Sequence, residues 1–168
     1  MRSKLIVAIV VLLSGSTAVL AQTKISGTLH CSKAGTIEEH ALEVGDRPNH
    51  SLSISKYKCT WPKPMEIAGT QTKETIVTGS DDVSGTNGSE GSERSYLTIT
   101  WANGDKSYIN EHSSWKTPNG VLEGTASWTF TGGTGKLKGI KGKGTYNFKA
   151  EPDGSNTYEV EGEYELLK

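Results

Sequence analysis

The chain carries few residues of the kinds that commonly do chemistry, and several of them fall within one short segment. His40 and His50 lie on either side of Asp46, and Glu43 lies between the two histidines. Imidazole titrates near neutral pH, so histidines beside a carboxylate can act as acid and base or hold a metal ion. His40, Glu43 and His50 are therefore candidate catalytic residues. The alternative is that each histidine only makes hydrogen bonds at or near the surface.

Asp46 is followed directly by Arg47, in a chain where arginine is scarce. Beyond residue 2, Arg47 and Arg94 are the only arginines. A guanidinium–carboxylate pair at the mouth of a cavity can orient a ligand carbonyl or carboxylate, which makes Asp46 and Arg47 candidate ligand-binding residues. The same pair can instead serve only to stabilise a turn.

The familiar motifs of metal, nucleophile and phosphate chemistry are missing. The chain has no HExxH segment, no cysteine cluster with zinc spacing and no GxSxG motif. The glycine-rich segment 128–146 fits neither the Walker pattern nor the dinucleotide pattern, because the required spacing of glycine and lysine is not met. The sequence therefore predicts no metal site and no cofactor.

Aromatic residues are the other candidates for a site. Tyr57, Cys59 and Trp61 alternate with polar residues and so share one face of a strand, and Trp101 and Trp128 fall in similar runs. In a small β protein such rings pack in the core or line a ligand cavity. Tyr57, Trp61, Trp101 and Trp128 are candidate ligand-binding residues, with core packing as the alternative.

The elements that carry these residues are short strands. Glutamates at every second position from Glu159 to Glu165 alternate with apolar or small residues, which predicts one solvated and one packed face. Glu74 and Glu111 also lie within strand-like runs and could be inward acids, although glutamate in a strand faces outward by default. Gly79–Gly91 is rich in serine, glycine and aspartate and is expected to be a mobile loop. The other runs are Lys24–Cys31, Ile37–Val44, His50–Trp61, Thr72–Thr78, Arg94–Trp101, Lys106–Ser114, Val121–Thr131 and Gly139–Lys149.

These nine runs predict an all-β fold, either a sandwich or an antiparallel barrel. A closed barrel is favoured because closure removes exposed strand edges, and eight strands leave room for side chains or one small ligand. We therefore expect a single eight-stranded antiparallel closed barrel, with nine strand runs, over residues 22–168.

Residues 1–21 have the features of a signal peptide. A basic start is followed by the apolar run Leu5–Leu13 and by small residues up to Ala21. This run is too short for a membrane span, which needs roughly 20 residues. We expect cleavage after Ala21, a secreted or periplasmic location, and no integral membrane span in the mature chain.

The mature chain is mildly acidic and has two cysteines. Cleavage removes two of the 18 Lys and Arg residues and none of the 19 acidic residues, which leaves a net charge of −3. That balance argues against nucleic-acid binding. In an oxidising compartment Cys31 and Cys59 are expected to form one disulfide, which stabilises by about 3–4 kcal/mol in the chain-entropy model.

Two segments resemble the allene oxide cyclase and dirigent barrel superfamily. Those proteins carry a strand ending in Thr-Gly-Gly-Ser/Thr-Gly, a short link and a glycine-containing strand, and Phe130–Gly135 and Gly139–Gly144 match this layout. Allene oxide cyclases also have an early hairpin with an Asp-Arg turn, which Leu42–His50 resembles. The chain resembles secreted bacterial barrels of this type.

This resemblance implies a calycin-like, eight-stranded barrel with a largely apolar cavity, which in the plant cyclases binds a fatty-acid epoxide and orders a water molecule. Asp46 and Arg47 carry over to this chain. Ala41 and Glu43 stand where the cyclases have a Glu and an Asn, and Asn49-His50 replaces their Ser-Pro. These departures argue against fatty-acid cyclisation.

The expected function is binding of a small hydrophobic molecule in the barrel. No strong catalytic set is visible, but a cyclase or isomerase needs little more than a shaped, dry cavity and one acid or base. A third alternative is an envelope-associated protein-interaction module. The barrels of this type often form dimers or trimers, so a homo-oligomer is also left open.

Overall fold

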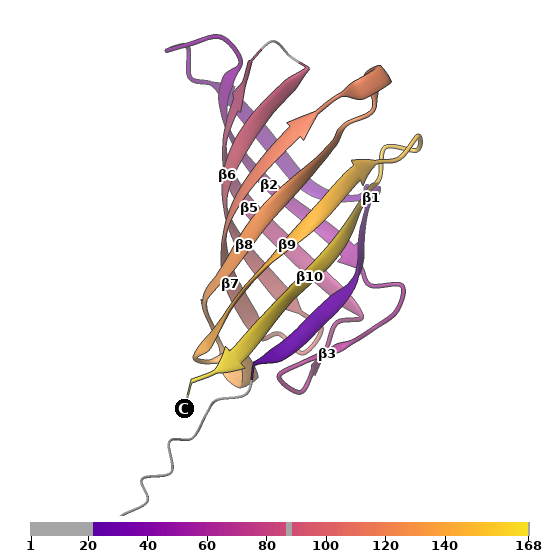
Figure 1. The fold of residues 1–168 in the computed structure, drawn as a ribbon, viewed down its shortest axis with the longest axis vertical. Helices are drawn as coiled ribbons and strands as arrows, with labels where there is room; N and C mark the ends of the chain where they lie inside the picture. The colour runs from indigo at the N-terminus through magenta and orange to yellow at the C-terminus, as the bar shows by residue number, and fades with distance from the viewer. Residues whose placement is uncertain (1–21, 87–88, 168) are drawn as a thin grey trace, which may run out of the picture.

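The computed structural model describes residues 22–86 and 89–167, and the expected signal peptide lies outside this part of the chain. Eight antiparallel strands form a closed barrel in the order β1-β10-β9-β8-β7-β6-β5-β2 (Figure 1). They are β1 (Thr23–Glu43), β2 (His50–Thr60), β5 (Glu74–Gly85), β6 (Glu90–Trp101), β7 (Lys106–Lys116), β8 (Glu123–Gly133), β9 (Ile140–Ala150) and β10 (Asn156–Leu166). The predicted all-β, eight-stranded closed barrel is confirmed.

The remaining elements are short. Strands β3 (Glu66–Ile67) and β4 (Thr70–Gln71) form a small hairpin, and Pro118–Gly120 and Gly135–Leu137 are one-turn 3-10 helices, η1 and η2. Among residues 22–86 and 89–167, no helix has the length and apolar character needed to cross a membrane.

The first strand joins two of the predicted runs. Residues 24–31 and 37–44 were expected as separate strands, but β1 continues through both, with irregular register between Cys31 and Glu38. Its first half pairs with β10 and its second half pairs with β2. Cys31 lies opposite Cys59 at the junction, and the two form the predicted disulfide. Nine runs therefore give eight barrel strands.

The prediction of a loop over Gly79–Gly91 is wrong for most of this segment. β5 extends to Gly85 and β6 begins at Glu90, with residue pairs continuing from Gly79–Leu97 to Gly85–Gly91. Small polar residues indicated a loop, but the ladder with the neighbouring strands keeps them extended, since a strand position inside a closed sheet is decided by its neighbours more than by propensity.

One end of the barrel is closed by packed side chains. The β3–β4 hairpin and η2 lie at this end, shown below in Figure 1, and contribute the fully buried Ile67 and Leu137. The first residue of β9, Ile140, is also fully buried. The backbone N–H of Ala68 in the hairpin donates to the Tyr164 hydroxyl at 2.9 Å. This end therefore forms the apolar floor of the barrel.

Inward-facing glycines make room for the large rings of the interior. Trp128 on β8 lies against Gly144 on β9 and Gly162 on β10, where an added Cβ would overlap its indole ring. Gly27 on β1 likewise faces the ring of Trp61. The glycines of residues 139–144 thus serve the interior packing as well as the turn, where Gly139 adopts a φ of +77°.

Candidate functional site

A cavity of about 180 Å³ lies inside the barrel above its apolar floor. Its wall is mostly aliphatic and aromatic, and strands all around the barrel contribute to it. Tyr57, Trp61, Trp101 and Trp128, which the sequence indicated as candidate ligand-binding residues, all line this cavity. Trp101 and Trp128 also belong to the buried core, so these rings both pack the interior and bound the empty space.

Three carboxyl groups enter the interior from neighbouring strands. Asp81 on β5 pairs in register with Ser95 on β6, and Ser95 pairs with Glu111 on β7, so the two acids flank one serine. Glu93 lies two residues from Ser95 on the same face of β6. Ser53 donates a hydrogen bond to Asp81 Oδ2 at 3.0 Å, and Ser95 donates to Glu93 Oε1 at 2.9 Å.

Burial changes the acidity of these groups. Burial is the main cause that raises the pKa of Glu111 to about 7; hydrogen bonding by Tyr146 partly opposes this rise, and the charges of Glu93 and Asp81 add to it. Burial and the neighbouring charge of Asp81 also raise the pKa of Glu93. A carboxyl with a pKa close to neutral is present in both protonation states at physiological pH.

Three tyrosines complete this polar region. Burial, followed by the charge of Glu111, raises the pKa values of Tyr146 and Tyr158, and burial with Glu39 raises the pKa of Tyr57 to about 12. All three hydroxyls therefore stay protonated and can donate hydrogen bonds. The rings of Tyr146 and Tyr158 meet edge to face, with centroids 5.4 Å apart. We call the six residues together the acid–tyrosine wall: Tyr57, Asp81, Glu93, Glu111, Tyr146 and Tyr158.

No positive charge balances this wall from inside. Neither lysine nor arginine is among the residues lining the cavity, and none is among the buried residues of the described chain. Several lysines instead pair with acids on the outside, as Lys58 does with Glu74 at 3.0 Å. The barrel interior is therefore acidic, and the lysines and arginines of the described chain lie outside it.

Trp61, which lines the same cavity, carries an unused hydrogen-bond donor. The residue is only 6% exposed, and its indole N–H has no hydrogen-bond partner among the described residues. A buried donor without a partner costs about 1–3 kcal/mol. A polar ligand atom in the cavity would supply an acceptor.

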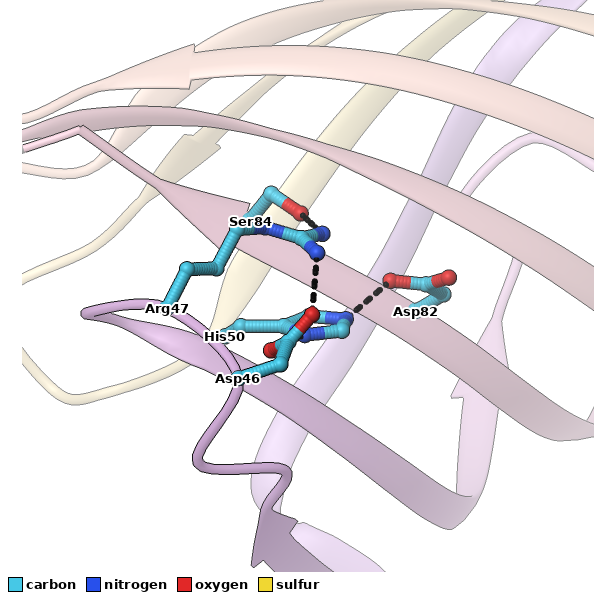
Figure 2. A network of polar contacts seen from close by, with 5 residues as sticks. All are labelled: Asp46, Arg47, His50, Asp82 and Ser84. Atoms are coloured by element: carbon cyan, nitrogen blue, oxygen red, sulfur yellow. Dashed lines mark hydrogen bonds and ion pairs between the residues drawn. The ribbon is translucent and has the colours of Figure 1, made fainter.

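Asp46, Arg47 and His50 form a separate network on the outside of the barrel (Figure 2). The His50 imidazole contacts Asp46 through Nδ1 and Asp82 Oδ1 through Nε2, the latter at 3.0 Å. Arg47 donates to Asp46 Oδ2 and to the Ser84 hydroxyl, each at 2.7 Å. Neither Asp46 nor Arg47 lines the cavity, and the network ties the β1–β2 turn to β5.

The pKa shifts in this network favour the charged forms of both His50 and Asp46. The hydrogen bond to Asp46 is the main cause that raises the pKa of His50, and the same bond lowers the pKa of Asp46. The protonated imidazole can donate from both ring nitrogens to the two carboxylates. The arrangement therefore holds a turn in place through charge-assisted hydrogen bonds.

The structure does not bring the candidate catalytic residues together. His40 on β1 lies opposite Ile54 rather than His50, and it contacts Glu38 at 3.5 Å with 74% of its side chain exposed. Glu43 ends β1 as an exposed residue. His40, Glu43 and His50 all lie outside the cavity wall.

The acid–tyrosine wall is the part of the site that sequence reasoning largely missed. For Glu111 the outward orientation was the default and the inward one the alternative; it lies on the inward face of β7 between the buried residues Ile109 and Ser113. Glu111 lies two positions from Ile109 and so shares its strand face, which was a usable signal. Glu93 shares a face with Ser95 and Leu97 in the same way. The rule that strand glutamates face solvent outweighed that signal.

The distribution of ligand-type side chains is unlike that of a metal site. Among the described residues, no three or more His, Cys, Asp or Glu side chains converge in a way that could hold a metal ion. The interior acids are instead spread over three strands.

In the comparisons with known proteins, neither a protein-family model nor a curated protein sequence matches the chain.

Proposed function

We propose that this protein binds one small, mostly apolar molecule in the cavity of its barrel. The observation that carries the proposal is the cavity of about 180 Å³ lined mostly by apolar and aromatic side chains. An apolar cavity of about 150 Å³ is large enough to hold benzene. The space therefore suits a molecule with one ring and a short substituent rather than a long acyl chain.

Polar groups in the wall indicate that the ligand is not a pure hydrocarbon. Glu111 and Tyr146 border the cavity at one place and Trp61 at another. Ligand pockets commonly combine an apolar lining with a few polar groups that fix orientation. The ligand accordingly has an apolar body that contacts the tryptophans and at least one polar group.

We also propose that the protein is exported. The Cys31–Cys59 disulfide supports this proposal because such bonds persist in oxidising compartments. Export would give the barrel access to small molecules outside the cytoplasm. Comparing the N-terminal sequence of the protein recovered from a periplasmic or culture fraction with the full chain tests both export and cleavage before Gln22.

The binding proposal is tested with benzyl alcohol as a neutral, single-ring probe. Isothermal titration calorimetry should show saturable binding to the wild-type protein. Val160→Phe adds a ring to the cavity wall and should abolish binding. Ile54→Phe adds the same ring where the side chain is 56% exposed on β2, and should leave binding unchanged. Equal binding to both variants would refute a ligand site in the cavity.

The state of Glu111 favours a second candidate function, acid–base catalysis on a small hydrophobic substrate. A carboxyl with a pKa of about 7 in an apolar cavity is suited to take and return a proton near neutral pH. Phenylacetone, a single-ring ketone with acidic α-protons, is a suitable probe. The wild type should accelerate exchange of these protons in D₂O about a hundredfold. Glu111→Gln should lose this acceleration. Glu161→Gln, at an exposed position, should behave as wild type.

A further inference from the structure

The charge inside the barrel has only one sign. Asp81, Glu93 and Glu111 face the interior, whereas no lysine or arginine lines the cavity. Moving a carboxylate out of water is costly unless a cation or several hydrogen-bond donors accompany it. The described chain supplies serine and tyrosine hydroxyls to these acids but no cation. Without a cation, burial favours the protonated forms of Glu111 and Glu93 and raises their pKa values, whereas a bound cation would stabilise the carboxylates.

The aromatic rings around the cavity favour a cation as its occupant. Trp101, Trp128, Tyr146 and Tyr158 all contribute to its wall. The face of an aromatic ring carries negative electrostatic potential and attracts cations, most strongly when the site is shielded from water. Among the three acids, Glu111 lines the cavity, and its carboxyl beside the aromatic rings is complementary to an organic cation and unfavourable to a carboxylate.

The occupant needs to be an organic cation rather than a metal ion. The acids come from three adjacent strands, and among the described residues no group of three or more ligand-type side chains converges on one point. The surrounding wall is predominantly apolar, and its free space matches one ring. A metal ion would leave that apolar space empty, whereas an amine with a hydrocarbon body would fill it.

We propose that the molecule bound in the cavity is a small protonated amine with a single-ring apolar body, held with its ammonium group against Glu111 and its ring among the tryptophans. The proposal rests on the binding function proposed above and specifies the ligand class. An ammonium group has three donors, which the Glu111 carboxylate and nearby tyrosine oxygens can accept. The indole ring of Trp61, which also lines the cavity, adds to the aromatic surface that the ligand contacts.

Three probes of almost equal shape and different charge test the ligand class. Benzylamine is cationic at neutral pH, benzyl alcohol is neutral and benzoate is anionic. We expect calorimetry to show that benzylamine binds about tenfold more tightly than benzyl alcohol, because charge-assisted hydrogen bonds are roughly twice as strong as neutral ones. Benzoate should bind more weakly than either.

Two variants show whether Glu111 provides the preference. Glu111→Gln should reduce the affinity for benzylamine about tenfold to the level of benzyl alcohol, while benzyl alcohol binding is retained. Glu161→Gln, which removes the same charge from an exposed position on β10, should retain the preference. Glutamine resembles the protonated form of Glu111, and the benzyl alcohol titration itself reports whether the variant is folded.

The possible outcomes separate the two proposals. If benzyl alcohol binds as tightly as benzylamine, or if both Gln variants lose the preference equally, the amine proposal is overturned while the binding function stands. If none of the three probes binds the wild type, the binding function and the amine proposal both fail. A preference that depends on Glu111 and disappears in Val160→Phe supports both.

Discussion

The indole ring of Trp128 on β8 occupies the space that a side chain at Gly144 on β9 would need. The two residues are paired in register, and an ideal Cβ on Gly144 would overlap Trp128 Cζ2. The same ring fills the space in front of Gly162 on β10. One tryptophan thus extends across two neighbouring strands and forms both the core and part of the cavity wall.

Gly144→Ala is therefore expected to destabilise the barrel. The new methyl group would meet both the Trp128 ring and the Glu161 carbonyl, and overpacking of this kind costs about 1–3 kcal/mol. Gly132→Ala on β8 is the matched control, because its Cβ would meet only Tyr108 Cδ2, at 3.8 Å. Urea unfolding should show a lower free energy of unfolding for Gly144→Ala alone. Equal stabilities would contradict the packing of Trp128 against Gly144.

The disulfide is expected to contribute strongly to stability. Cys31 and Cys59 are separated by 28 residues in sequence, and a cross-link over such a loop stabilises by about 3–4 kcal/mol in the chain-entropy model. The double variant Cys31→Ala, Cys59→Ala should lower the free energy of unfolding by about that amount. Wild type treated with a reductant should unfold at a similarly low urea concentration, whereas the double variant should not respond to the reductant. A double variant as stable as the oxidised wild type would contradict this role.

The outer network around His50 predicts a stability contribution that varies with pH. The pKa of His50 is raised by Asp46, so its contribution is fully present below the unfolded value of 6.5 and is lost as pH rises through the raised value. The pKa of Asp46 is lowered, so its contribution is present above 3.8 and is lost as pH falls through the lowered value. The network therefore stabilises most between these two limits.

His50→Gln tests this dependence. The loss of unfolding free energy relative to wild type should be largest at mildly acidic pH and should shrink as the solution becomes alkaline. His40→Gln, at a side chain that is 74% exposed, should change stability little at any pH. A loss for His50→Gln that stays constant over this range would show that the protonated imidazole is not what the network stabilises.

The fold was predictable because its main features follow from local alternation. The period of two in residues 158–166 indicated a strand with acids outside, and Asn103-Gly104 indicated the β6–β7 hairpin, where Gly104 adopts a φ of +84°. The continuity of β1 was not predictable in the same way, because pairing with β2 and the Cys31–Cys59 bond hold the segment between its two halves in the sheet. Such long-range contacts leave no local pattern.

The site was predictable only in its apolar half. An aromatic residue on the inward face of a strand is expected inside, so the tryptophans and Tyr57 could be placed from sequence. An acid on an inward face is unusual because burying a carboxyl is costly. Glu111 is accommodated through neighbours on other strands, such as Tyr146, which forms a hydrogen bond with it. Asp46 and Arg47 attracted attention through their chemistry, but the turn places them on the outside.

Glu111 predicts that the free energy of unfolding falls as pH rises, because burial raises the pKa of this carboxyl. Its pKa is raised from 4.5 to about 7 by burial, with Glu93 and Asp81 adding to the rise and Tyr146 opposing it. The stability contribution of protonated Glu111 is fully present below 4.5 and is lost as pH rises through about 7, at a cost of about 3 kcal/mol when the shift is fully expressed.

Glu111→Gln should therefore gain stability relative to wild type as pH rises, by about 3 kcal/mol between acidic and mildly alkaline solution. The measurement is the difference in unfolding free energy between variant and wild type across this range, so that the titration of all other groups cancels. Glu161→Gln should give a difference that changes little, because this side chain is exposed on β10. A constant difference for Glu111→Gln would mean that the carboxyl is solvated in the folded protein, and the acid–tyrosine wall would then lose the residue on which the amine selectivity depends.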